Sequence, residues 1–167
     1  MKESNQIYIC RIIFLILSIM VATIIFMFSS QNGDESKTTS RGFTRKIVDI
    51  VPFTKNLEEE QKQQIVENVQ PVIRKMAHFS IYTILGICLF NFFRTFKWIR
   101  KKQIILTIGT GAIYAISDEI HQFFSDGRAP LIKDVFIDTA GCLFGVGIML
   151  LVIKLVKKAK KRQKKYR

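Results

Sequence analysis

Ionisable side chains interrupt two apolar segments of this sequence, at positions where a membrane-spanning helix would be apolar throughout. Residues 117–145 read SDEIHQFFSDGRAPLIKDVFIDTAGCLFG. The interrupting residues are Asp118, Glu119, His121, Asp134 and Asp138. A charge at the centre of a lipid-facing helix costs about 2.5–3.5 kcal/mol on insertion scales, so such residues normally face protein, water or one another. This stretch is therefore the first candidate for a functional site.

Histidines and carboxylates in this pattern support several kinds of chemistry. In an enzyme acting on a lipid-linked substrate, His78 or His121 would serve as general base and Arg128 would hold a phosphate. In a metal site, Asp118 and His121 would share one helix face, with His78 and Asp138 completing the ligand set. Chains of acids and histidines also carry protons in transporters, although a few short helices leave little room for alternating access. In a purely structural network, Arg74 or Arg128 would neutralise the acids.

The sequence lacks the motifs that would decide for catalysis. It contains no nucleophilic serine motif, no glycine-rich phosphate loop and no H-E-x-x-H pair. Two residues on one helix do not define a metal site. We therefore assign no cofactor and no metal from the sequence, and we favour a non-catalytic binding protein over an enzyme.

Long apolar runs in the 167-residue chain indicate an all-α integral membrane protein. We predict one domain over residues 1–167, with four transmembrane helices in a small bundle, and the first run is too long for a signal peptide. The predicted spans are residues 7–28, 76–93, 103–124 and 134–156. The three cysteines all lie in apolar runs without a C-x-x-C pair, which is typical of buried residues and not of disulfides or zinc ligands.

The segments between the spans differ in character. Residues 29–75 form a polar outer loop, in which we expect two short amphipathic helices lying on the membrane or on the mouth of the bundle. The first carries apolar residues from Phe43 to Val51, and Asn56 would cap the second, with Glu59 three positions later. Residues 157–167 form a basic tail.

Positive charge is concentrated in short segments, as membrane topology would place it. The net charge is +13, and residues 94–102 and the tail carry no acid. Short loops rich in Lys and Arg stay in the cytoplasm, so we expect both termini inside and residues 29–75 and 125–133 outside. This distribution argues against a nucleic-acid partner. The bilayer itself is the expected partner, with anionic lipid at the tail.

This topology places the polar residues of three spans at one depth near the outer surface. Helical spacing aligns Arg74, His78 and Tyr82 on the second span, and small residues at Gly141 and Gly145 favour close helix packing on the fourth. We predict that these stripes face one outward-opening pocket. Its central residues are Asp118, His121 and Asp138, with support from Glu119, His78, Gln122, Tyr82, Arg128, Asp134 and Arg74.

The same residues carry a resemblance to the VanZ-like family of bacterial membrane proteins. The matching motifs are FSSQ at 28–31, RKxxHFxxY at 74–82, SDExHQxFxxGR at 117–128 and DxxxDxxGxxxG at 134–145. The resemblance implies a multi-pass protein of the bacterial plasma membrane. The family's namesake is associated with low-level resistance to the glycopeptide teicoplanin. We therefore expect the pocket to bind a lipid or peptidoglycan-precursor head group, or to alter how a lipophilic glycopeptide reaches the cell surface.

Overall fold

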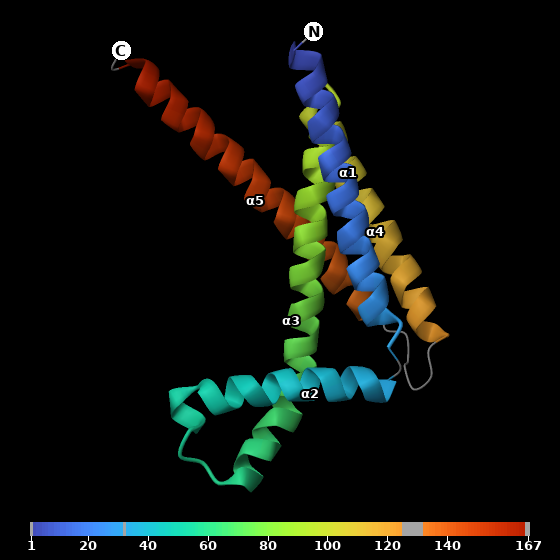
Figure 1. The fold of residues 1–167 in the computed structure, drawn as a ribbon, viewed down its shortest axis with the longest axis vertical. Helices are drawn as coiled ribbons and strands as arrows, with labels where there is room; N and C mark the ends of the chain where they lie inside the picture. The colour runs from blue at the N-terminus through green and yellow to red at the C-terminus, as the bar shows by residue number, and fades with distance from the viewer. Residues whose placement is uncertain (1, 32, 125–131, 166–167) are drawn as a thin grey trace.

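Every regular element in the residues that the structure describes is a helix. The computed structural model describes residues 2–31, 33–124 and 132–165. Its elements are α1 (Lys2–Ser29), α2 (Gly33–Ile50), the 3-10 helix η1 (Pro52–Thr54), α3 (Glu59–Arg94), α4 (Arg100–Phe123) and α5 (Ile132–Lys165). Helices α1, α3, α4 and α5 run alternately in opposite directions, so the two chain ends lie at the same end of the molecule (Figure 1). Helix α2 lies across the opposite end (Figure 1). The predicted all-α class is confirmed.

Three of the described helices, α1, α3 and α5, are long and apolar enough to cross a membrane. Helix α4, which contains the third predicted span at residues 103–124, does not meet this standard. It has 24 residues, which gives a length of about 36 Å, so length is not the reason. The polar side chains of Gln103, Asp118 and Glu119 lower its hydropathy, and all three are buried. Length and composition therefore support three of the four predicted spans and leave the span on α4 unconfirmed.

The prediction of a second short amphipathic helix in the loop is wrong. Residues 59–75 form the first half of α3, which continues without interruption through Pro71. The residue that caps this helix is Glu58, whose backbone N–H donates to the Gln61 side chain at 3.2 Å, and not Asn56. Val66 is fully buried. Val69 and Val72, further along the same half, are 38% and 57% exposed, so only part of its apolar surface is covered.

Helix α2 lies across the end of the bundle and is tied to the first half of α3. The Gln70 side chain donates to the Lys37 carbonyl oxygen at 2.9 Å and to Ser40 Oγ at 2.8 Å. Arg45 donates to Glu59 at 2.5 Å. Helix α2 also carries exposed apolar residues, among them Phe43, Ile47 and Ile50. This is the first of the predicted amphipathic helices, and it is longer than predicted.

Small residues let α3 and α5 approach closely. A Cβ atom on Gly141 would lie 2.5 Å from the carbonyl oxygen of Phe79, and one on Gly86 would lie 2.5 Å from that of Cys142. The Cys142 thiol is fully buried and donates to the Tyr82 carbonyl oxygen at 3.3 Å. This contact fixes the register between the helix that carries His78 and the helix that carries Asp138.

Polar contacts hold α1 beside α4 and beside the end of α3. The Tyr114 hydroxyl of α4 donates to the Ala22 carbonyl oxygen of α1 at 2.6 Å. Near the chain ends, Arg11 Nε donates to Thr95 Oγ1 at 3.2 Å, just after α3 ends. Helix α5 does not end at residue 156, where the predicted span ends, but continues into the basic tail as far as Lys165.

Candidate functional site

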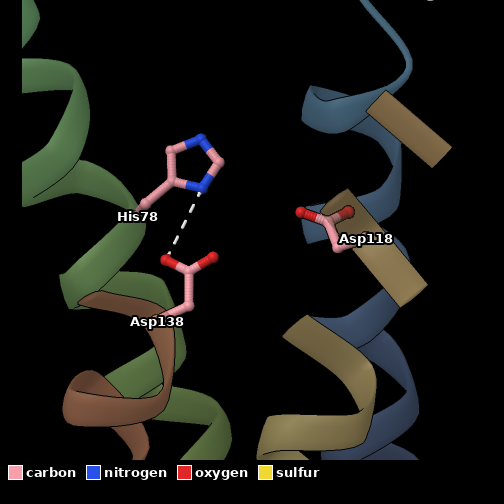
Figure 2. A group of neighbouring side chains, drawn as sticks. All are labelled: His78, Asp118 and Asp138. Carbon is pink, nitrogen blue, oxygen red and sulfur yellow. Dashed lines mark ion pairs between the residues drawn. The ribbon is translucent and has the colours of Figure 1, made fainter. Parts of the chain in front are cut away.

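Three helices bring His78, Asp118 and Asp138 together in the end of the bundle near α2. One ligand atom from each residue lies within 4.8 Å of the others. Figure 2 shows the His78 imidazole and the Asp138 carboxylate pointing toward one another, with Asp118 coming from the neighbouring α4. The His78 Nδ1 and Asp138 Oδ1 atoms are 3.9 Å apart, which is an ion-pair distance and too long for a hydrogen bond. We call these three residues the His–Asp cluster.

The cluster is closed to solvent on its acidic side. Asp118 is 4% exposed and Asp138 is 2% exposed, whereas the His78 side chain is 28% exposed. Two carboxylates removed from water require hydrogen bonds or a positive charge to offset the loss of hydration. No lysine or arginine among the described residues forms an ion pair with either acid. The cluster therefore holds more negative charge than its own partners compensate.

Several oxygens in and beside the cluster have no hydrogen-bond partner within the described chain. Gln122 Nε2 donates to Asp118 Oδ2 at 3.0 Å, but Asp118 Oδ1 and Asp138 Oδ1 have no hydrogen-bond donor. The Tyr82 hydroxyl, on α3 one turn after His78, is also buried without a hydrogen-bond partner in the described chain. Each unsatisfied buried group costs about 1–3 kcal/mol. Native structures rarely retain such groups without a functional or ligand-binding reason.

Two basic residues of α3, Arg74 and Lys75, lie within about one turn of His78, and one of them is paired with another acid. Lys75 Nζ forms an ion pair with Asp134 Oδ1 at 2.9 Å, one turn before Asp138 on α5. We did not predict a role for Lys75, although its position three residues before His78 places both on one face of α3. Arg74 lines a cavity beside the cluster.

The remaining predicted residues fall in different places. The His121 ring packs against Phe26 of α1, with 4.6 Å between ring centroids, and it is not part of the His–Asp cluster. Glu119 is buried at 8% exposure, and Gln122 is bound to Asp118. Arg128 lies outside the described residues.

A cavity of about 350 Å³ lies between α1, α2 and α3. Most of its wall area is apolar, although half of the residues that line it are polar. His78 lines this cavity and also belongs to the His–Asp cluster, so the two features adjoin. The cavity-lining residues are Ile25, Phe28, Gln31, Ser36, Thr39, Ser40, Phe43, Ile73, Arg74, Ala77, His78 and Ile81.

A comparison of the chain with models of known protein families agrees with the motifs found in its sequence. The family model described as VanZ/LLP1 matches residues 14–154, which is most of the chain. The match includes the His–Asp cluster and the parts of α1, α2 and α3 that line the cavity. No curated protein and no solved structure matches the chain. With apolar helices long enough to cross a membrane and a family match over most of its length, this membrane protein belongs to the VanZ/LLP1 family.

Proposed function

We propose that this VanZ-family protein binds a membrane amphiphile, with the polar head group at the His–Asp cluster and part of the apolar chain in the cavity. The observation that carries this proposal is the position of His78, which lines the cavity and faces Asp138 across 3.9 Å. An amphiphile is the ligand that matches an apolar cavity beside a buried polar group.

Arg74 on the cavity wall favours a phosphate in the head group, and the oxygens of Asp118 and Asp138 that are unpartnered in the described chain favour head-group hydroxyl or ammonium donors facing them. Ile25, Phe28 and Ile81 supply apolar wall, and Arg74 supplies a guanidinium one turn before His78. Arginine holds phosphate and carboxylate through paired hydrogen bonds. A lipid phosphate or the phosphate of a cell-wall precursor is therefore the head group that we favour.

The proposal places four helices in the bacterial plasma membrane, with α4 as the fourth span. Both termini lie in the cytoplasm and α2 lies on the outer surface, because positive charge concentrates in residues 94–102 and at the end of α5. The neighbouring spans shield the polar side chains of α4 from lipid. In this orientation the cluster lies near the outer leaflet, where lipid-linked precursors and lipophilic glycopeptides are found.

Family membership supports a role in the response to such antibiotics. A protein that binds an amphiphile near the outer leaflet would alter how a lipid-bearing glycopeptide such as teicoplanin reaches its target. A purely structural charge network is less well supported, because Asp118 Oδ1, Asp138 Oδ1 and the Tyr82 hydroxyl have no hydrogen-bond partner in the described chain.

The test is to fill the cavity and measure bound amphiphile. Ala77→Trp places a large side chain in the cavity from a position that is not part of the packed core. Ala140→Trp makes the same change on the exposed face of α5. We expect native mass spectrometry of the purified chain to show a co-purifying amphiphile in the wild type and in Ala140→Trp, and none in Ala77→Trp. Equal retention in both variants would contradict the proposal.

A further inference from the structure

We propose that His78 Nδ1, one carboxylate oxygen of Asp118 and one of Asp138 bind a single divalent cation between α3, α4 and α5. Their ligand atoms already lie within 4.8 Å of one another. A metal about 2.0–2.2 Å from each ligand would bring tetrahedrally arranged ligands to about 3.4 Å apart. Side-chain rotations that move the ligand atoms by about 1 Å close that difference without moving the helices.

The unpartnered oxygens are a second and independent observation for a cation. Asp118 and Asp138 are both more than nine-tenths buried, and Oδ1 of each has no hydrogen-bond donor among the described residues. The two acids belong to the group that converges with His78 (Figure 2). A cation would satisfy both oxygens at once, which no side chain of the described residues does.

The charge around the cluster also favours a cation. The two carboxylates face one histidine, and Lys75, three residues before His78 on α3, is engaged by Asp134 at 2.9 Å. A divalent ion compensates two buried negative charges, and buried charges in proteins are normally paired or bound to metal. Close packing of α3 and α5 at Gly141 holds two of the three ligands in place without the ion.

The ligand set indicates the class of ion. One imidazole nitrogen and two carboxylate oxygens suit Zn²⁺ or Mn²⁺ better than Ca²⁺ or Mg²⁺, which prefer oxygen ligands throughout. Three protein ligands leave further coordination positions open. An anionic head group in the adjoining cavity would be a ligand for such a position, and this last step rests on the proposed function.

The experiment uses the full chain, purified in detergent without a polyhistidine tag and stripped of metal with EDTA. Mn²⁺ binding is followed by electron paramagnetic resonance and Zn²⁺ content by elemental mass spectrometry after dialysis. We expect one ion per chain. Asp118→Asn and Asp138→Asn should each weaken binding by at least about 100-fold. Mutating a residue that only hydrogen-bonds to a metal ligand already lowers metal affinity by about 10–100-fold, and these two residues are proposed as ligands themselves. Asp34→Asn, on the exposed face of α2, is the matched control and should leave affinity unchanged.

A second variant keeps the test decisive where an asparagine variant does not fold. His78→Asp retains three ligands but replaces nitrogen with oxygen, so the preference for Zn²⁺ over Mn²⁺ should fall by about tenfold or more. A wild-type chain that binds neither ion at 1 mM, about the weakest affinity of protein sites for divalent ions, overturns the inference. So does unchanged selectivity in His78→Asp, or equal affinity in Asp138→Asn and Asp34→Asn.

The two proposals fail in distinguishable ways. Cation binding without a co-purifying amphiphile would leave the metal site standing and refute the proposed function. Amphiphile retention in the EDTA-treated protein that binds neither Mn²⁺ nor Zn²⁺ would refute the metal site and leave the proposed function standing.

Discussion

The close contact between α3 and α5 predicts that one alanine substitution destabilises the protein while the same substitution two turns away does not. A Cβ atom on Gly141 would lie 2.5 Å from the Phe79 carbonyl oxygen and 3.1 Å from Tyr82 Cβ. The first of these is a backbone atom and cannot rotate away, so α5 must shift from α3. Overpacking of this kind costs about 1–3 kcal/mol. At about 2–4 °C per kcal/mol for a chain of this size, Gly141→Ala should lower the melting temperature by about 2–12 °C.

Gly147→Ala is the control on the same helix. A Cβ atom there meets nothing within 4 Å. Alanine is the better helix former by about 0.5–1 kcal/mol, so this variant should melt at or slightly above the wild-type temperature. The assay is loss of helical circular dichroism on heating in detergent. If Gly141→Ala proved as stable as Gly147→Ala, the α3–α5 contact that places His78 beside Asp138 would be refuted.

Three further predictions concern topology, phenotype and helix contacts. In intact cells, an impermeant thiol reagent should label Glu35→Cys and not Trp98→Cys in a cysteine-free background, and labelling of the latter would overturn the orientation. Expression in a susceptible Gram-positive host should raise the inhibitory concentration of teicoplanin more than that of vancomycin, and no change despite confirmed membrane expression would count against the antibiotic role. Tyr114→Phe removes the 2.6 Å hydrogen bond to the Ala22 carbonyl oxygen. The free energy of unfolding should fall by about 1 kcal/mol and the melting temperature by about 2–4 °C. An unchanged melting temperature would show that this bond does not hold α1 against α4.

The all-α class, and the convergence of polar residues from three helices, could be predicted from the sequence because both follow from the spacing of apolar and polar residues. Apolar runs predict long helices, and polar residues at His78, Asp118 and Asp138 can avoid lipid only by facing one another. The structure places these three side chains together. Whether they form a functional site stays a prediction.

Other features depend on packing that periodicity does not encode. His121 lies about 60° around the helix from Asp118, since three residues turn an α-helix by about 300°. That small offset turns its ring toward Phe26 of α1 and away from the cluster. The continuity of α3 was missed because the polar stretch before Met76 and the proline at position 71 both indicate an interruption. In the structure Val66 is fully buried and the helix runs unbroken through Pro71.

The central claim is that the His–Asp cluster is a binding site and not a structural brace, and Asp138→Asn tests it most directly. Melting temperature and co-purifying amphiphile are measured on the same EDTA-treated sample. If the cluster binds a ligand, this near-isosteric change should leave the melting temperature close to that of the wild type and remove the amphiphile. If Asp138 braces the helices, loss of a buried charge pair should cost about 3–5 kcal/mol, or about 6–20 °C. A fall of that size, with amphiphile retained in the folded fraction, would contradict the account.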